Sequence, residues 1–462
     1  MKKILTIFIL ILTGGICFAD NPVEKLNLNE AVDLAIKNNI DFQAAKLDAD
    51  IAKNNIKVAN RLQNPDFNVF YNFGSAGKGN PQTFGLSENI EIAKRGARKK
   101  LAKSNYELAK ENLKYFEFDL KMDVREAYVN LVAAKAILKT LQDQQKLLQD
   151  LLSIAKRRYE AGAAPEIDVI QAEIALNQMT TQVNTASVNV KSAMFEFNKV
   201  INPKDKSYLK FDSADNSLNT SLTGLNSPNP KNNLPDFDSI SENTLNNRFD
   251  IRIAKQQVDV AEKNLSVVIR QRIPDLAIQG GYGYQAKGMS DDGRFKTGAY
   301  AGASLVNIPL LYAYRPEIKN AKLEVEKAEL NYISTQNKAM KDLNRAYEKF
   351  VTAQMNLNYY NDKLLKSSEE MIRVSKRSYE VGKSNLTTLI VMEQSYKSII
   401  VGYTNALAEY YNCWIDFLRE VNQEELKLDN ETIQQTFENS NQKQIHFCND
   451  CIDINFNRYI LP

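Results

Sequence analysis

Residues 101–160 decide the fold: LAKSNYELAKENLKYFEFDLKMDVREAYVNLVAAKAILKTLQDQQKLLQDLLSIAKRRYE. Apolar residues recur at alternating steps of four and three, which places them along one face of a helix in a coiled coil. One extra four-residue step, at Leu120, relaxes the supercoil. The pattern predicts a single helix from about residue 97 to residue 160, roughly 95 Å long, which needs partners along its whole length. The predicted inward positions are Ala102, Tyr106, Ala109, Leu113, Phe116, Leu120, Val124, Ala127, Leu131, Ala134, Leu138, Leu141, Gln145, Leu148, Leu152, Ala155 and Tyr159.

The same pattern occurs a second time. When 219 is added to each position, the second series is again mostly apolar or aromatic, and the break in the spacing recurs. A shorter motif, Tyr159-Glu160-Ala161-Gly162, matches Tyr379-Glu380-Val381-Gly382 at an offset of 220. The sequence therefore predicts an internal tandem duplication. The second series is Ala321, Val325, Ala328, Tyr332, Thr335, Ala339, Leu343, Ala346, Phe350, Ala353, Leu357, Tyr360, Leu364, Ser367, Met371, Val374 and Ser378.

Two glycine-rich windows interrupt the helical pattern and predict strand pairs at residues 66–91 and 275–309. Apolar and polar residues alternate in the first window, as at Phe67, Val69 and Tyr71, and each strand of about ten residues suits a tilted strand in a membrane. Two soluble hairpins are the alternative interpretation. In a membrane, four strands cannot close a barrel, and open sheet edges are not tolerated. Three copies of the chain would supply twelve strands.

The N-terminal residues predict an exported protein. Two lysines, a short apolar run and Ala19 are typical of a secretory signal peptide over residues 1–19. The run is too short to span a bilayer as a helix. Lipid modification of Cys17 is the disfavoured alternative, because the residues before it do not match the usual pattern.

Composition excludes several classes of function. The 59 Lys and Arg are nearly balanced by 56 Asp and Glu, which argues against a nucleic-acid binder that relies on bulk positive charge. His446 is the only histidine, so a His-based triad and a multi-histidine zinc site are excluded. Cys448 and Cys451 have CxxC spacing, for which a tail disulfide or an unimportant thiol pair is favoured over a redox or metal site. No phosphate-binding loop, nucleophile motif or metal-ligand cluster occurs, so we expect no enzyme activity and no cofactor.

The order of helix, strand pair, very long helix, tight turn and returning helix, present twice, resembles the TolC-like outer membrane efflux proteins. The resemblance covers about residues 28–422. It implies a mainly α fold with a β-barrel, in which a homotrimer forms a twelve-stranded barrel in outer membrane lipid, continued by a twelve-helix coiled-coil tube through the periplasm. It also implies a passive channel for efflux or type I secretion, opened by a periplasmic adaptor protein and an inner-membrane pump of the resistance or ABC type.

The resemblance also assigns residues to the helix tips. Gly162 and Gly382 would reverse the chain there, because glycine adopts positive φ at low cost. Asp168 matches an acidic tip residue of the family, whereas Thr388 stands where the second repeat often carries an acidic residue. These four residues form the predicted gate and adaptor-docking site. The alternative for Asp168 is a solvated carboxylate or a local ion pair.

Further alternatives stay open at this level. Arg157-Arg158 and Lys376-Arg377 either bind the adaptor, or pair with acidic neighbours, or, as the favoured interpretation, form a solvated charged face. Trp414 belongs either to a membrane-interface belt or, as favoured, to helix packing. For the whole protein, the alternative is a periplasmic coiled-coil scaffold without a pore.

The predicted domains are the signal peptide 1–19, the first repeat 20–203 with its tip at 160–165, the linker or equatorial region 204–239, the second repeat 240–424 with its tip at 380–385, and an unassigned tail 425–462.

Overall fold

The computed structural model describes residues 23–71, 82–201, 210–218, 237, 244, 247–284, 298–380 and 383–424. The predicted signal peptide and the C-terminal tail with Cys448 and Cys451 lie outside these residues. The chain divides into two compact units, each built from three segments. Unit 1 comprises Met1–Ile40, Leu120–Asn232 and Val351–Ile415, and unit 2 comprises Asp41–Asp119, Asn233–Phe350 and Asp416–Pro462.

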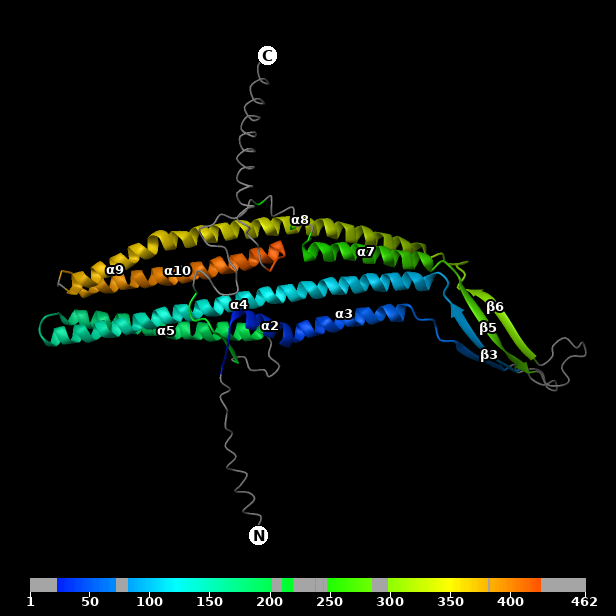
Figure 1. Ribbon diagram of the computed structural model, residues 1–462, viewed down its shortest axis with the longest axis horizontal. Coiled ribbons are helices and arrows are strands. Elements are labelled where there is room, and N and C mark those ends of the chain that lie inside the picture. Colours follow the sequence, from blue (N-terminus) through cyan, green and yellow to red (C-terminus); the bar gives the residue numbers. More distant parts are fainter. Residues whose placement is uncertain are drawn as a thin grey trace, which may run out of the picture. The chain divides into compact units, whose positions relative to one another are not determined.

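Helices and strands follow the same order in both halves of the sequence (Figure 1). After β1 (Glu24–Leu26), the first half contains α2 (Leu28–Asn38), α3 (Ile40–Ala59), β2 (Asp66–Tyr71), β3 (Gln82–Ile90), α4 (Lys94–Glu160) and α5 (Glu166–Ile201). After β4 (Phe211–Ser213), the second half contains α7 (Phe249–Arg270), β5 (Asp275–Tyr284), β6 (Gly298–Val306), α8 (Arg315–Tyr359), a π-helical turn η1 (Tyr360–Leu364), α9 (Leu365–Glu380) and α10 (Leu386–Val421).

The long helix α4 has the inward face that its spacing predicts. Every predicted inward position is buried or half-buried, apart from Tyr159, which is exposed. The middle of the helix is buried on more than this face, because Met122, Val129 and Val132 are also fully covered. In the second half the same agreement extends from Ala321 to Leu364, where all the predicted inward positions are buried or half-buried.

Beyond Leu364 two of the four predicted inward positions are wrong, while Met371 and Ser378 are half-buried. Ser367 and Val374 are exposed, whereas Ser368, Ile372 and Tyr379 are buried. The cause is η1. A π-helical turn holds one more residue than an α-helical turn, so each inward residue after η1 lies one position later in the sequence than the offset of 219 predicts. The extra residue accounts for the change of offset between the two halves from 219 to 220.

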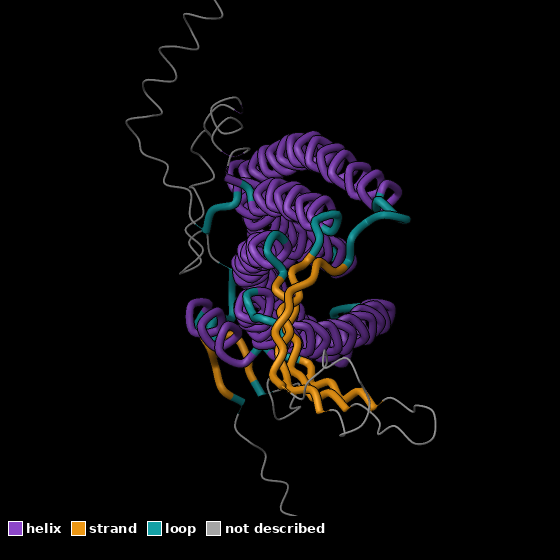
Figure 2. The backbone as a smooth tube through the Cα atoms, turned by 90° about the vertical axis from the view of Figure 1, so that its right-hand side faces the viewer, coloured by secondary structure: helices purple, strands orange, loops and turns teal. Residues whose placement is uncertain are grey.

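Unit 2 contains one antiparallel sheet with the order β2-β3-β5-β6, and Figure 2 shows its four strands lying side by side. The pairing of β3 with β5 runs from Gln82 opposite Tyr284 to Ile90 opposite Leu276, and it joins the two halves of the sequence. Strands β2 and β6 are therefore the outer strands, and each has one side without a partner strand among the described residues.

Unit 1 holds several fully buried aromatic side chains. Tyr410, Tyr411 and Trp414 on α10 are almost completely covered, which agrees with helix packing and not with a membrane-interface belt. Part of the predicted linker is also ordered here, since β4 pairs in parallel with β1. The hydroxyl of Tyr128 donates a hydrogen bond to Asp215 at 2.7 Å, so the segment after β4 is fixed to α4.

Candidate functional site

The sheet of unit 2 has two chemically different faces. Because side chains alternate along a strand and the register aligns them across strands, one face collects the apolar residues. They are Phe67, Val69 and Tyr71 on β2, Phe84, Leu86 and Ile90 on β3, Leu276, Ile278, Tyr282 and Tyr284 on β5, and Ala299, Ala301, Ala303 and Leu305 on β6. Most of the large ones are exposed, and Glu88 is the one charged side chain among the described residues of this face. An exposed apolar face of this extent is typical of a surface that meets lipid.

The opposite face is mostly polar and rich in glycine, and the exposed Phe70 is its large apolar exception. It carries Asn68 and Ser87, whose side chains are hydrogen bonded at 2.9 Å, together with Thr83, Asn89 and Gln279. Tyr300 also lies on this face, opposite Gly281. A sheet with apolar residues on one face and polar residues on the other has the alternation of a membrane barrel with a water-filled interior.

Glycine is required where Tyr300 crosses the sheet. A Cβ atom placed on Gly281 would lie 2.8 Å from the Tyr300 hydroxyl, 2.7 Å from the Cα of Gly85 and closer still to the carbonyl oxygen of Phe84. The Tyr300 hydroxyl occupies the space beside Gly85 in the same way. An aromatic side chain laid over glycines of neighbouring strands is a recognised way to stabilise such positions.

The strands meet the helices at a polar junction. Asp275, the first residue of β5, accepts a hydrogen bond from Lys94 at 2.6 Å and another from Asn307 at 3.0 Å. Lys94 is the first residue of α4, and Asn307 directly follows β6. One buried carboxylate therefore holds the ends of three elements together.

In unit 1, the first helix tip is closed by Gly162. Its φ of 69° lies in the left-handed region, which costs glycine little. The amide of Gly162 donates to the Tyr159 carbonyl at 2.9 Å, and the amide of Ala163 donates to the Arg158 carbonyl at 2.8 Å. These two bonds constitute a Schellman motif, so the predicted role of Gly162 in the turn is observed.

The second tip shares one of these bonds. The amide of Lys383 donates to the Ser378 carbonyl at 2.9 Å, which is the counterpart of the bond from Ala163 to Arg158 at an offset of 220. Gly382 lies outside the described residues. Asn385 is the residue before α10, and its side-chain oxygen accepts hydrogen bonds from the Thr388 amide at 2.8 Å and the Thr388 hydroxyl at 2.6 Å. Thr388 is therefore part of an N-terminal helix cap.

Asp168 occupies the equivalent place in α5. It lies in the first turn of that helix, where a negative charge interacts favourably with the helix dipole, and its side chain is half-buried. The tips of the two halves also contact each other within unit 1, since the hydroxyl of Thr387 donates to the side-chain oxygen of Gln171 at 2.5 Å. The structure thus brings Gly162, Asp168 and Thr388 to the turns of two adjacent helical hairpins.

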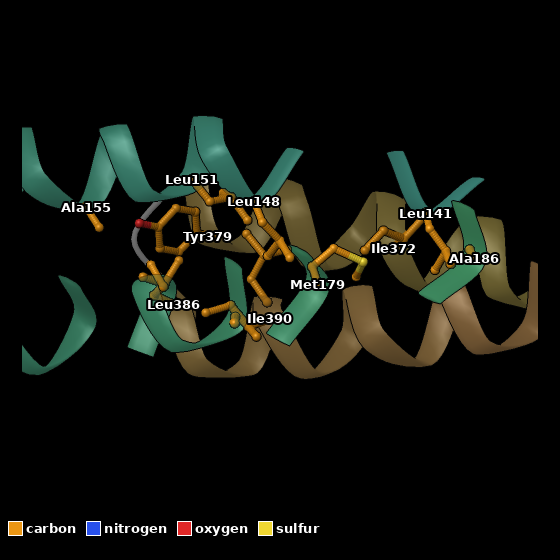
Figure 3. Close-up of a cluster of buried hydrophobic side chains, with 13 residues drawn as sticks. Leu141, Leu148, Leu151, Ala155, Met179, Ala186, Ile372, Tyr379, Leu386 and Ile390 are labelled. Atoms are coloured by element: carbon orange, nitrogen blue, oxygen red, sulfur yellow. The ribbon is translucent and has the colours of Figure 1, made fainter. Parts of the chain in front are cut away.

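Sequence reasoning found Leu141, Leu148 and Ala155 among the α4 side chains that join these hairpins, but missed those of the other three helices. Buried side chains from α4, α5, α9 and α10 form one continuous row (Figure 3). Tyr379 lies in this row and is 8% exposed, whereas its counterpart Tyr159 is 45% exposed. The guanidinium of Arg158 stands over the ring of Tyr379 at 5.3 Å, a favourable cation–π arrangement. The signal that could have found Tyr379 is the offset of 220.

Glu393 belongs to the repeated hairpin motif, where it is the counterpart of Glu173 at an offset of 220, but the sequence assigned it no role. Its carboxylate is almost fully buried on α10 and lies 3.1 Å from Lys376 of α9. Burial raises the pKa of Glu393, and the hydrogen bond and charge of Lys376 partly oppose that shift. Lys376 therefore pairs with an acidic neighbour, which is one of the predicted alternatives, and Arg158 has an aromatic partner, whereas Arg157 and Arg377 are exposed.

Two kinds of feature are absent from the described residues. No cluster of three or more His, Cys, Asp or Glu side chains there could hold a metal ion. No helix in the described part of the chain combines the length and the apolar character needed to cross a membrane.

Comparison with protein families decides the identity. The sequence model of a family described as "Outer membrane efflux protein" matches residues 31–201 and 240–408. These two segments correspond to the two predicted repeats and together cover more than half of the chain. The chain belongs to this family. It is an outer membrane efflux channel that extends into the periplasm, so the predictions of family, function and location are confirmed.

Individual relatives of this efflux channel are distant in sequence. The cobalt-zinc-cadmium resistance protein CzcC of Cupriavidus metallidurans is 19% identical over 397 residues, which are 85% of this chain and 89% of that protein. The CmeC outer membrane channel of Campylobacter jejuni is 19% identical, with a TM-score of 0.69 and 89% of each chain covered. VceC of Vibrio cholerae is 15% identical, with a TM-score of 0.68 and coverage of 86% of this chain and 96% of that one. The two solved structures show that the efflux channel shares their fold.

Proposed function

We propose that three copies of the chain assemble into a twelve-stranded barrel in the outer membrane, continued by a twelve-helix tube in the periplasm. The observation that carries the proposal is the two-faced sheet with its two outer strands, β2 and β6. In lipid, the backbone groups on the outer sides of these strands need hydrogen-bonding partners. Pairing of β6 with β2 of the next copy satisfies them, and four strands from each of three copies make twelve.

Two apolar stripes on helices of unit 2 also support the trimer. Leu323, Leu330 and Ile333 on α8 are exposed and follow each other at steps of seven and three residues. Leu47, Ile51 and Val58 on α3 are exposed at steps of four and seven. Heptad-spaced apolar side chains are typical of a seam between helices. A neighbouring copy that packs against each stripe would cover both.

The helix tips supply the proposed gate and docking site. Gly162 turns the chain at the first tip, Gly382 is assigned the same role at the second by its sequence position, and Asp168 and Thr388 lie in the first turns of the returning helices α5 and α10. A periplasmic adaptor protein docks at these tips and links the channel to an inner-membrane pump of the resistance or ABC type. The pump supplies the energy, and the channel is a passive conduit whose polar sheet face lines the bore.

Cross-linking between subunits tests the assembly. Val69→Cys on β2 is combined in turn with Ala299→Cys, Ala301→Cys and Ala303→Cys on β6, in a chain whose native cysteines are replaced. A short bismaleimide should then produce bands of two and three times the chain mass. As the matched control, Val69→Cys with Phe84→Cys joins directly paired residues of one chain and should leave the mass unchanged.

Two measurements on the unmodified protein complete the test. Heat-resistant trimers in outer membrane fractions and single-channel conductance in a planar bilayer are expected. Monomers that osmotic shock releases from the periplasm, without conductance, would instead support the scaffold without a pore.

A further inference from the structure

The loop between β6 and α8 exposes apolar side chains at the junction of sheet and helices. We call residues 307–314, Asn307-Ile-Pro-Leu-Leu-Tyr-Ala-Tyr314, the junction loop. Leu310 is 84% exposed and Leu311 is 103% exposed, more than any other large apolar side chain in the described part of the chain. Ile308 and Tyr312 of the same loop are about half exposed. Together these four side chains form an uncovered apolar patch.

The junction loop is held in this conformation by specific contacts. Asn307 and Tyr314, at its two ends, both have positive φ values, 59° and 53°, which are uncommon for residues with a side chain. Asn307 donates to Asp275 at 3.0 Å, and Arg272 donates to the backbone carbonyl of Ala313 at 2.9 Å. Because these contacts tie both ends of the loop to residues at or just before the start of β5, they hold Leu310 and Leu311 in their exposed positions.

Contacts inside the junction loop also keep its apolar side chains outside. The amide of Leu310 donates to the carbonyl of Ile308 at 2.9 Å, which forms a tight turn around Pro309. The hydroxyl of Tyr312 donates to Glu317 of α8 at 2.6 Å, and the Tyr312 ring packs edge-on against Tyr314. Tyr312 thus combines an apolar ring with a hydroxyl group that already has a hydrogen-bond partner. This arrangement suits the boundary between hydrocarbon and water.

The position of the loop indicates what covers it. Leu305, one residue before the end of β6, lies on the apolar face of the sheet in line with Ile90 and Leu276. The junction loop directly follows β6, at the end of the sheet where the strands join the helices. On its helical side, the exposed Arg272 and Arg315 provide positive charge, which suits phosphate groups.

We propose that Leu310 and Leu311 insert into the periplasmic leaflet of the outer membrane, with Tyr312 at the lipid–water boundary and the two arginines at the phosphates. The junction loop then fixes the depth of the barrel in the bilayer. This inference rests on the proposed barrel, since it takes the apolar face of the sheet to be the lipid-facing one. The proposed partner of the junction loop is phospholipid, and contact of the loop with a neighbouring subunit would overturn the proposal.

Fluorescence quenching separates these outcomes. The full-length channel, with its native cysteines replaced and Leu311→Cys labelled with bimane, is reconstituted in vesicles of phosphatidylethanolamine and phosphatidylglycerol at about 3:1. Acyl-chain-brominated phospholipid should quench the fluorescence at least twofold, and aqueous iodide should quench it little. Quenching by iodide would show a loop in water, and quenching by neither would show a loop covered by protein. Either result overturns the proposal.

Two further probes distinguish failure of this inference from failure of the barrel. Leu305→Cys on the apolar face should be quenched by brominated lipid if the barrel exists, whatever the loop does. Met355→Cys is the negative control, because Met355 is a similarly exposed apolar residue of α8 outside both stripes, forty residues beyond Arg315 and about 60 Å further along the helix. Quenching at Leu305 but not at Leu311 would overturn only the loop proposal, whereas loss of quenching at both positions, together with loss of the heat-resistant trimer, would overturn the barrel.

Discussion

Gly281→Ala should break the pairing of β3 with β5, although it adds a single methyl group. The new Cβ would lie 2.7 Å from the Cα of Gly85 and closer still to the carbonyl oxygen of Phe84. Carbon atoms in contact are normally about 3.5–4.0 Å apart, so the two strands would have to separate locally by roughly 1 Å. The neighbouring atoms belong to the backbone, which cannot rotate out of the way as a side chain can.

The size of the effect follows from this crowding and from the hydrogen bonds between β3 and β5 that it stretches. Overpacking of a well-packed site costs about 1–3 kcal/mol, and each backbone hydrogen bond that is stretched without replacement costs about 1–3 kcal/mol where water is excluded. We therefore expect a loss of about 2–4 kcal/mol per subunit. Since 1.4 kcal/mol is a factor of ten in an equilibrium constant, the assembled form should fall by a factor of roughly 30 to several hundred.

The assay is the temperature at which the trimer band dissociates on a semi-native gel, measured on outer membrane fractions. Gly280→Ala is the matched control, because its added Cβ would meet only the Tyr300 carbonyl oxygen, at an ordinary 3.7 Å, on the other face of the sheet. Gly281→Ala should lower the dissociation temperature strongly, and Gly280→Ala should change it little. If the two variants dissociate at the same temperature, the close approach of β3 and β5 does not exclude a side chain at residue 281, and the reasoning is refuted.

Three smaller effects are expected in thermal unfolding measurements on the purified channel. Tyr128→Phe should lower stability by about 1–2 kcal/mol, because the Asp215 carboxylate loses the hydrogen bond it accepts at 2.7 Å; an unchanged unfolding temperature would contradict this. Gly162→Ala should cost about 1–2 kcal/mol for its φ of 69°, whereas Gly96→Ala, inside α4 and equally free of neighbours within 4 Å, should stabilise by up to about 1 kcal/mol. Because burial raises the pKa of Glu393 above 4.5, the folded protein binds that proton more tightly, so its stability falls as pH rises through the folded-state pKa. Glu393→Gln should therefore raise the unfolding temperature at about pH 7.5, with a gain that disappears towards pH 4.5; a gain that is independent of pH would exclude the titration of Glu393 as its cause.

The repeated architecture could be predicted because it depends on periodic signals. The spacing of apolar residues in α4 identifies its inward face as far as Ala155, and the second copy of the spacing identifies α8. The positions of the strands follow from alternation and glycine content. Tyr300 shows the limit of this reasoning, since it lies on the polar face while Ala299, Ala301 and Ala303 supply the apolar one. Only the register of the paired strands reveals that arrangement, because the glycines that receive Tyr300 come from two other strands.

The tips could be predicted in part. Gly162 could be found because a left-handed residue is needed to end a helix, and one residue type supplies it cheaply. The partners of Arg158 and Lys376 could not be found, because a cation–π contact and an ion pair between helices depend on side chains brought together from separate elements. Glu393 could be recognised as the repeat counterpart of Glu173, but its burial could not, since a buried carboxylate and an exposed one look the same in a sequence.

The π-helical turn explains why equivalent positions in the two halves present different surfaces. One residue inserted into an α-helix would turn everything after it by about 100°, and η1 absorbs this residue instead. Positions after Leu364 therefore correspond to the first half at an offset of 220, which pairs the Ser368 position with Leu148 and the Ile372 position with Leu152. The same offset pairs Tyr379 with Tyr159, yet one is buried and the other is exposed. The duplicated halves thus share a backbone plan at the tips but not a side-chain environment, so a role assigned to a residue in one half does not transfer to its counterpart by alignment alone.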